Sequence, residues 1–242
     1  MKKGTIYVVG LGPGNPENMS PECLEAIEKS DVIVGFKTYI KLVEHLVEGK
    51  EIDSTGMKKE VERCNNVVAY AEAGKNVALI SSGDAGVYGM AGILLELVPE
   101  DMNVEVIPGI TAANAAAACL GAPIMHDYVT ISMSDLLTDW ELIKKRVDCA
   151  GQGDFVVCIY NPRSMGRQNQ IVEARDILLK HKKPDTPVGI VRNAKRVGQE
   201  VEITTLEKMM ECEINMFTMV IIGNSMTYVK NNKMITPRGY KI

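Results

Sequence analysis

The stretch Thr5-Ile6-Tyr7-Val8-Val9-Gly10-Leu11-Gly12-Pro13-Gly14 joins a short apolar run to a turn rich in glycine and proline. The run has the length and the β-branched character of a buried strand. Open parallel sheets bind their ligands at the carboxyl ends of their strands. The stretch therefore predicts the first strand of an α/β sheet and a ligand-binding turn after it, although a plain tight turn would show the same residues.

This turn lacks the features of the common nucleotide-binding motifs. A dinucleotide-binding turn starts its helix within the glycines, whereas Pro13 and Pro16 delay the helix here until about Ser20. The strand predicted next, Asp31–Val34, is followed by Gly35, where a ribose-binding motif would place an acidic residue. No GxxxxGK[ST] sequence is present, so a P-loop is excluded.

Helices and strands alternate along the first half of the chain. Ser20 and Pro21 have the character of an N-cap and a first helical residue. The expected helices are Pro21–Lys29, Tyr39–Val47, Lys58–Ala73, Met90–Leu97 and Ala112–Cys119, and the further strands are Asp31–Val34, Val77–Ser81 and Val104–Ile107. This alternation predicts a mainly parallel sheet with helices on both faces.

The second half predicts a separate α/β domain. Gly121-Ala122-Pro123 interrupts the alternation and suggests a boundary, with domains at 1–122 and 123–242. A turn alone separates the strands Val188–Val191 and Glu200–Thr204, which predicts an antiparallel pair within a mixed sheet. The other expected elements are strands Val129–Ser132, Phe155–Tyr160 and Met219–Ile222 and helices Trp140–Cys149, Ser164–Lys180 and Leu206–Glu211.

The composition is that of a soluble globular protein. Of the 242 residues, 46% are hydrophobic and 24% are charged, and no apolar run approaches the ~18 residues of a membrane span. The amino-terminal residues show no signal peptide, so we expect a cytoplasmic protein without a membrane partner. The 6 cysteines form no CxxC pair, which favours free thiols and predicts no metal site.

The net charge of −4 is unevenly distributed. Residues 1–122 hold 10 basic and 17 acidic residues, a net −7, whereas residues 123–242 hold 17 and 14, a net +3. Residues 163–196 alone hold 9 basic and 3 acidic residues, a net +6. This segment is either a solvated face or a site for a polyanionic ligand.

Two further loops end strands of the first half in the same way. Ser81-Ser82-Gly83-Asp84 follows one strand and Pro108-Gly109-Ile110-Thr111-Ala112 follows another. Carboxyl ends of parallel strands share one edge of a sheet, so the three loops predict a single crevice. There Asp84 can bind an ammonium or a hydroxyl group, or it can cap the following helix.

The three loops together resemble those of the tetrapyrrole (corrin/porphyrin) methylase family. Gly10–Gly14 matches its GxGPG turn, Ser82–Asp84 its G/S-G-D loop and Pro108–Ala112 its PGITA segment, while Ala85 replaces a usual proline. The resemblance implies methyl transfer from S-adenosyl-L-methionine, with S-adenosyl-L-homocysteine as product. It also implies a homodimer, and two α/β domains with the cofactor in the cleft between them.

Motifs of the second half resemble one branch of this family, which methylates C17 of precorrin-3B or its cobalt counterpart and contracts the ring in cobalamin biosynthesis. These motifs are His126–Tyr128, Ile131–Thr138, Tyr160–Ser164 and Thr186–Ala194. Whether the substrate already holds cobalt stays open.

The alternatives are a precorrin-4 C11-methyltransferase, an rRNA or diphthamide methylase and a non-catalytic nucleotide-binding module. The sequence pI of about 5.5 disfavours a nucleic-acid partner.

The resemblance also suggests roles for individual residues. Asp84 would pair with the cofactor's ammonium, and Thr111 could equally cap a helix. Ala194 replaces a glycine common in relatives. The implied cofactor-binding residues are Gly12, Pro13, Gly14, Ser82, Gly83, Asp84, Val87, Tyr88, Thr111 and Ala112, and, on the adenosine side, Tyr160, Asn161, Arg192, Asn193 and Ala194.

The implied substrate is a tetrapyrrole with many carboxylate side chains, which would give the basic segment a use. Arginine binds carboxylates through two parallel hydrogen bonds. The candidate substrate-binding residues are Ser132, Ser134, Asp135, Arg163 and Arg167. Arg175, predicted two helical turns beyond Arg167, is either a further contact or an exposed helix residue.

A macrocycle carbon would itself attack the methyl group, so no serine or cysteine nucleophile is needed. Ring contraction also requires proton transfers. The candidates for this role are Asp135, His126 and Arg163, although His126 could be a plain surface or core residue.

Overall fold

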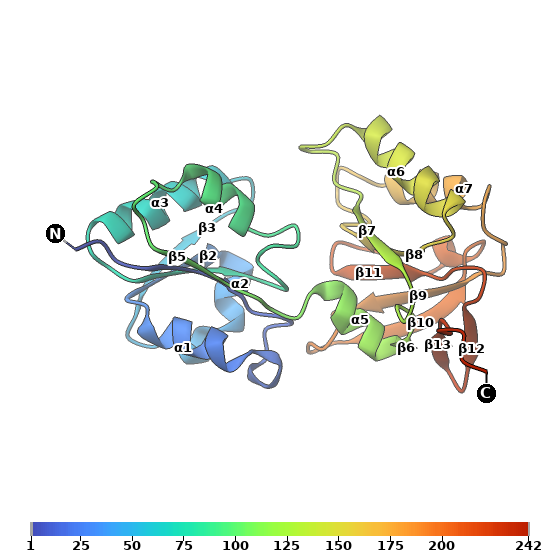
Figure 1. Ribbon diagram of the computed structural model, residues 1–242, viewed down its shortest axis with the longest axis horizontal. Coiled ribbons are helices and arrows are strands. Elements are labelled where there is room, and N and C mark those ends of the chain that lie inside the picture. The colour runs from blue at the N-terminus through green and yellow to red at the C-terminus, as the bar shows by residue number, and fades with distance from the viewer. Residues whose placement is uncertain (1, 242) are drawn as a thin grey trace. The chain divides into compact units, whose positions relative to one another are not determined.

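The computed structural model describes residues 2–241, which divide between Ala112 and Ala113 into two units (Figure 1). The sequence predicted this division at Pro123, and it lies instead before helix α5 (Ala112–Leu120). Helix α5 packs on the second unit, because a Cβ added at Gly189 would meet Leu120 Cδ1 at 2.3 Å. The amide of Ala113 also donates to the Tyr160 hydroxyl at 3.2 Å.

The first unit contains a parallel sheet of five strands in the order β3-β2-β4-β1-β5. The strands are β1 (Ile6–Gly10), β2 (Val32–Phe36), β3 (Glu51–Thr55), β4 (Val77–Ser81) and β5 (Val104–Ile107). All neighbouring pairs run parallel, which confirms the predicted topology. Strand β3 was not predicted, because this edge strand is mostly polar and exposed.

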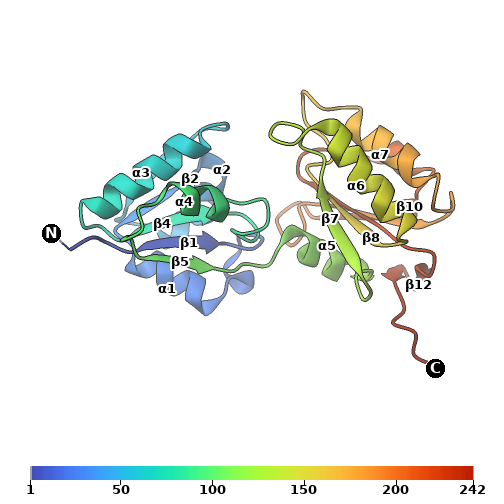
Figure 2. The same cartoon turned by 45° about the horizontal axis from the view of Figure 1, so that its top comes forward.

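Helices cover both faces of this sheet (Figure 2). Helix α1 (Pro21–Lys29) and the short α2 (Lys37–Leu42) pack on one face, and α3 (Glu60–Glu72) and α4 (Ala91–Leu97) pack on the other. Ser20 caps α1 as predicted, since its Oγ accepts from the Cys23 amide at 3.0 Å. The helix predicted over Tyr39–Val47 is broken after α2 by a 3-10 turn, Glu44–Leu46; another such turn, Pro16–Asn18, precedes α1.

The second unit contains a mixed sheet in the order β10-β9-β11-β8-β7. Only β7 and β8 pair in parallel, and β9 and β10 form the predicted antiparallel pair. The elements are β7 (Tyr128–Ser132), α6 (Trp140–Gln152), β8 (Val156–Tyr160), α7 (Gln170–Leu178), β9 (Pro187–Arg192), β10 (Glu200–Thr205) and β11 (Thr218–Ile222). A small sheet of β6 (Gly121–Ala122), β12 (Tyr228–Lys230) and β13 (Lys233–Ile235) was not predicted.

Two helix predictions in this unit were wrong in extent. Helix α7 begins at Gln170 instead of Ser164, because Ser164 and Arg167 close a tight turn through reciprocal backbone hydrogen bonds of 3.0 and 3.1 Å. The helix predicted over Leu206–Glu211 is reduced to a 3-10 turn, Met209–Glu211.

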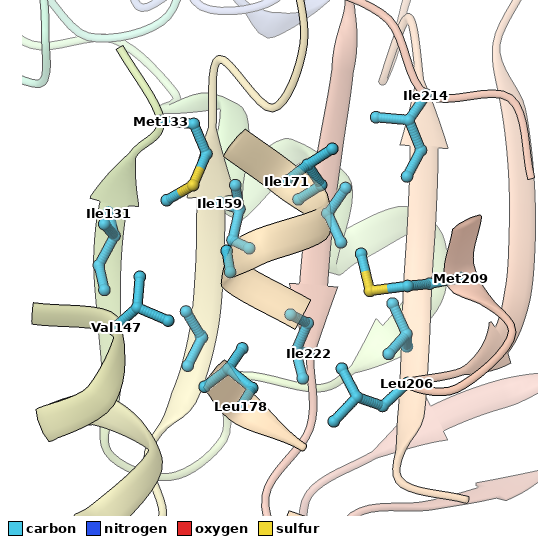
Figure 3. Close-up of a cluster of buried hydrophobic side chains, with 14 of the residues drawn as sticks. Ile131, Met133, Val147, Ile159, Ile171, Leu178, Leu206, Met209, Ile214 and Ile222 are labelled. Atoms are coloured by element: carbon cyan, nitrogen blue, oxygen red, sulfur yellow. The ribbon is translucent and has the colours of Figure 1, made fainter. Parts of the chain in front are cut away.

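The core of the second unit lies between α6, α7 and one face of the sheet (Figure 3). Val147 of α6 and Ile171 and Leu178 of α7 are buried against Ile131 and Ile159 of the sheet. Burying branched side chains of this size stabilises a fold by about 1.5–3 kcal/mol each. This core holds β7 and β8 side by side, and with them the loops that follow both strands.

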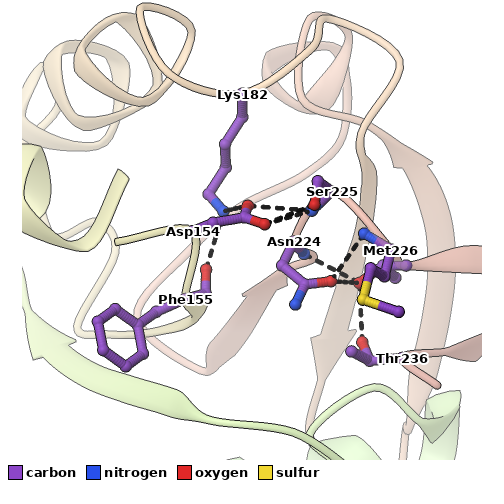
Figure 4. A network of polar contacts seen from close by, with 8 residues as sticks. Asp154, Phe155, Lys182, Asn224, Ser225, Met226 and Thr236 are labelled. Atoms are coloured by element: carbon purple, nitrogen blue, oxygen red, sulfur yellow. Dashed lines mark hydrogen bonds and ion pairs between the residues drawn. The ribbon is translucent and has the colours of Figure 1, made fainter. Parts of the chain in front are cut away.

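A polar network ties the carboxyl-terminal segment to this unit (Figure 4). Asp154 accepts from the amide and the hydroxyl of Ser225, and the buried Lys182 ammonium lies 3.4 Å from its carboxylate. Burial lowers the pKa of Lys182 against the opposing effect of Asp154. Burial of Asp154 acts to raise the pKa of its carboxyl, but the hydrogen bonds from Ser225 and the nearby Lys182 lower it by more. The pKa of that carboxyl is therefore also lowered.

Among residues 2–241, no helix combines the length and the apolar character that a membrane crossing requires. The same residues hold no group of three or more His, Cys, Asp or Glu side chains placed to bind a metal ion. The six cysteines are free thiols; four of them are buried, whereas Cys119 is half-buried and Cys149 is exposed. Burial raises the pKa of the Cys158 thiol to about 12, so this thiol stays protonated at neutral pH.

Candidate functional site

Three glycines bring the loops after β1, β4 and β5 into backbone contact. A Cβ added at Gly109 would lie 2.3 Å from the Gly83 carbonyl oxygen and 2.5 Å from that of Gly10. A Cβ at Gly10 would likewise meet the Gly109 nitrogen at 2.7 Å. Because these obstacles are backbone atoms, no side chain fits at either position. The three loops therefore meet through their main chains, as expected if they lie at one edge of the sheet.

Paired hydrogen bonds fix the first two of these loops. The Gly12 amide donates to the Gly83 carbonyl at 2.9 Å, and the Gly83 amide donates back at 2.8 Å. Both residues have a left-handed backbone, with φ of +61° and +71°, which glycine adopts without strain. A Cβ at Gly83 would meet the Ala112 nitrogen at 3.7 Å, an ordinary van der Waals contact, so the left-handed backbone is what favours glycine at this position.

Asp84 links the second loop to the third. Its Oδ1 accepts from the Gly86 amide at 2.8 Å, and its Oδ2 accepts from the Gly109 amide at 3.0 Å. The alternative that Asp84 caps a helix is wrong, because α4 begins at Ala91 with Met90 as its N-cap. Each carboxylate oxygen has a second lone pair, so Asp84 can still accept from a bound ammonium.

The other predicted residues of the first unit lie in these same loops. Pro13 and Gly14 are buried beside Gly12, and Thr111 and Ala112 are half-buried at the third loop. Tyr88 is 55% exposed and has a left-handed φ of +53°, which is strained for an aromatic residue. Its half-buried neighbour Val87 completes the segment between Asp84 and α4. The first-unit residues assigned to the cofactor thus lie on the three joined loops or on the segment between Asp84 and α4.

The second unit gathers its candidate residues at one edge of its sheet. Strands β8 and β9 both run antiparallel to β11, so β7, β8 and β9 all end at the same edge. Ser132 Oγ accepts from Asn161 Nδ2 at 3.0 Å and from the Ser134 amide at 3.1 Å. These bonds join the loop after β7 to the loop after β8. Tyr160, which ends β8, is buried.

Asp135 is held by two neighbours at this edge. Gln170 Nε2 donates to its Oδ2 at 2.9 Å, and Arg167 Nε lies 3.8 Å from its Oδ1. Arg167 precedes α7, so the expectation that Arg167 and Arg175 share one helix face was wrong. Arg175 pairs instead with the adjacent Asp176 at 2.7 Å.

Arg163 differs from Arg167 in having an unsatisfied donor. Its Nε is buried and has no hydrogen-bond partner among the described residues. A buried donor without a partner costs about 1–3 kcal/mol. The cost would fall if a ligand carboxylate accepted from this nitrogen, and guanidinium geometry suits such a ligand.

The loop after β9 combines a paired arginine with a left-handed asparagine. Arg192 forms ion pairs with Glu200 and, at 2.6 Å, with Glu213, and its hydrogen bonds to both glutamates raise its pKa. Its guanidinium is therefore engaged by two carboxylates, which leaves the backbone near Asn193 and Ala194 as the candidate contact to a ligand. Asn193 has φ of +50° and Asn161 after β8 has φ of +49°, a conformation that asparagine tolerates.

The structure does not bring His126 to the other proton-transfer candidates. It precedes β7, whereas Ser132 ends that strand and Asp135 follows it. A five-residue strand is about 16 Å long, so His126 lies near the opposite edge of the sheet from Asp135. Its Nδ1 accepts from the Asp127 amide at 2.8 Å.

Sequence reasoning missed the turn after β3, where Arg63 is buried against Thr55, Gly56 and Met90. No residue of this turn stood out, because the polar strand β3 was not predicted. The available signal was Arg63 itself, which stands among the apolar positions of the helix predicted over Lys58–Ala73.

Comparisons with known proteins agree with the family resemblance of the sequence motifs. Residues 5–210 match the family of Tetrapyrrole (Corrin/Porphyrin) Methylases. A cobalt-factor III methyltransferase of Priestia megaterium is 53% identical over 99% of this chain and 46% of its own length. A probable cobalt-factor III C(17)-methyltransferase of Salmonella typhimurium is 50% identical over 98% of this chain and 100% of its own. The crystal structure of the methyltransferase CobJ matches with a TM-score of 0.90 at 33% identity, over 97% of this chain and 100% of that one.

Proposed function

Because the chain belongs to the tetrapyrrole (corrin/porphyrin) methylase family, we propose that it methylates C17 of cobalt-factor III with S-adenosylmethionine in cobalamin biosynthesis. The observation that carries the proposal is the 50% identity to the Salmonella relative, which extends over the whole length of both proteins. The chain spans less than half of the Priestia relative, so the shared region alone supports the assignment. Contraction of the macrocycle ring in the same reaction is part of the proposal.

The first unit supplies a fitting site for the methionine part of the cofactor. Gly83 is partly exposed and carries no side chain, and Asp84 retains lone pairs for an ammonium. Bound S-adenosylmethionine supplies an electrophilic methyl group on a sulfonium. The loops of Gly12, Gly83 and Gly109 are held by backbone contacts, which fixes the ligand's orientation at little further entropic cost.

The second unit supplies charged groups for the macrocycle and atoms for proton transfer. We assign Arg163 to a substrate carboxylate because its buried Nε lacks a partner. Asp135 is the best-placed candidate for the proton transfers of ring contraction, since Gln170 and Arg167 orient its carboxylate. Tyr160, Asn161, Asn193 and Ala194 stay assigned to the adenosine side through their positions after β8 and β9.

The test is incubation of the purified protein with S-adenosylmethionine and either cobalt-factor III or precorrin-3B, read by mass spectrometry. We expect one added methyl group on cobalt-factor III. Transfer to precorrin-3B alone would place the protein on the route that inserts cobalt later. Absence of methyl transfer to both would refute the proposal.

The proposal includes a homodimer, as the family resemblance implies, located in the cytoplasm. Light scattering at micromolar concentration should give a mass near twice the chain mass of 26.5 kDa. A mass of one chain would remove the dimer from the proposal and leave the reaction untouched.

A further inference from the structure

Arg63 is a buried guanidinium without an acidic partner. Only 3% of the residue is exposed. Its Nε donates to Thr55 Oγ1 at 2.7 Å, its second terminal nitrogen donates to the Gly56 carbonyl at 3.0 Å, and its first lies 3.5 Å from Met90 Sδ. All these partners are neutral, whereas buried charges in proteins are usually paired with opposite ones. Arg63 therefore leaves a positive charge uncompensated among the described residues.

The partners of Arg63 place it at the edge of the sheet that carries the cofactor loops. Thr55 ends β3, and Met90 closes the segment that starts at Asp84 after β4. Strand β3 is two positions from β4 in the sheet, which corresponds to about 10 Å. Arg63 thus connects the turn Thr55–Lys59 to the segment after β4.

The same turn presents an exposed lysine and an exposed apolar side chain. Lys58 is exposed and has a left-handed φ of +60°, and no carboxylate of the described residues pairs with it. The neighbouring Lys59 is different, because its ammonium lies 2.6 Å from Glu62. Met57 is 63% exposed. The turn that is hydrogen-bonded to the uncompensated guanidinium thus also presents a free ammonium and a thioether.

We infer that the turn Thr55–Lys59 binds a peripheral carboxylate of the macrocycle, with Lys58 as the contacting group and Arg63 as its positioning residue. The inference rests on the proposed function, because the ligand is the polycarboxylate substrate of that reaction. A carboxylate at Lys58 also compensates the charge of Arg63, and Met57 offers apolar contact to the ring.

Calorimetric titration of the full chain with cobalt-factor III, and separately with S-adenosylhomocysteine, tests the role of Lys58. Lys58→Gly removes the ammonium and relieves the left-handed strain. We expect a Kd for cobalt-factor III about 10-fold weaker, equivalent to ~1.4 kcal/mol, and an unchanged Kd for S-adenosylhomocysteine. Lys58→Arg should restore most of the loss. Lys59→Ala is the matched control and should leave both constants unchanged.

A double-mutant cycle tests the positioning role of Arg63. Arg63→Met should weaken cobalt-factor III binding to a similar degree, and the double variant with Lys58→Gly should bind about as weakly as either single variant, because both remove one interaction. Losses that multiply to about 100-fold would show that Arg63 acts independently of Lys58. If Arg63→Met does not fold, the same cycle is measured with Arg63→Lys.

The outcomes separate this inference from the proposed function. Equal Kd values for wild type and Lys58→Gly would overturn the inference even if wild type transfers the methyl group. Weaker binding by Lys58→Gly would support the turn as a carboxylate site even if wild type binds cobalt-factor III without methylating it, an outcome that refutes the function alone. No binding of cobalt-factor III to wild type would overturn both.

Discussion

The two sheets of this protein present functional edges built from different materials. At the edge of the first sheet, Gly10, Gly83 and Gly109 meet backbone to backbone with no room for side chains. At the edge of the second sheet the groups are side chains. Gln170 donates to Asp135, and the buried Nε of Arg163 has no partner among the described residues. We propose that the main-chain edge serves the cofactor, which a whole family shares, and that the side-chain edge serves the substrate, which differs between members.

The largest effect should come from adding a side chain where Gly10, Gly83 and Gly109 meet, which we call the backbone junction. Gly109→Ala would place a Cβ 2.3 Å from the Gly83 carbonyl oxygen, and we expect a loss of about 3 kcal/mol or more in the free energy of unfolding. Urea denaturation measures it. Gly92→Ala is the matched control, because a Cβ there meets nothing within 4 Å in helix α4; it should stabilise by about 0.5–1 kcal/mol. Equal stability of the two variants would contradict the junction.

The next effect concerns Asp84, whose carboxylate accepts from Gly109 at the junction and is proposed to bind the cofactor's ammonium. Asp84→Ala should weaken S-adenosylhomocysteine binding about 10- to 100-fold, because it removes one charged acceptor worth ~1.5–3 kcal/mol. Calorimetric titration measures it, and Asp101→Ala, which removes an exposed carboxylate paired with Lys3, is the control. Unchanged affinity in Asp84→Ala would remove Asp84 from the cofactor site.

A smaller effect is expected at the side-chain edge. Arg163→Ala should weaken cobalt-factor III binding about 10-fold and leave the free energy of unfolding unchanged or higher, since it removes an unsatisfied buried donor. Arg175→Ala, whose guanidinium already pairs with Asp176, should bind normally. Intact substrate affinity and turnover in Arg163→Ala would contradict the substrate assignment and with it the contrast between the two edges.

The smallest effect lies away from both edges and depends on pH. The folded pKa of Asp154 is below its ordinary value of 3.8, so its stabilisation is present above that value and is lost as the pH falls through the folded pKa. Ser225→Ala should cost about 0.5–1 kcal/mol at pH 7, a modest value because the carboxylate is partly exposed. The difference from wild type should shrink below about pH 4. A difference independent of pH would contradict the network.

How far the sequence predicted this structure depends on burial. Strand β4 has the predicted bounds, because all its residues are buried. Strand β5 also has the predicted bounds although Glu105 and Val106 are exposed, because Pro108-Gly109 follows it and marks its end. The polar edge strand β3 and the short, exposed β12 carry no such pattern, and they were missed. The turn at Ser164–Arg167 is closed by a reciprocal pair of backbone hydrogen bonds, so its helix-compatible side chains were misleading.

For the candidate site, the sequence predicted which loops meet but not which side chains pair. Parallel topology alone brought the three glycine loops to one edge, and the structure confirms their proximity. The partners of individual side chains could not be predicted, because they depend on the path of each loop. Arg192 is occupied by two glutamates, and Arg63 holds a turn that sequence reasoning did not consider.

The position of the transferred methyl group tests the central proposal most directly. The protein is incubated with cobalt-factor III and S-adenosylmethionine labelled with carbon-13 in its methyl group, and the product is studied by NMR. We predict a single labelled methyl carbon attached to C17 of a ring-contracted macrocycle. A labelled methyl group on C11 or any other position, or none at all, would contradict it.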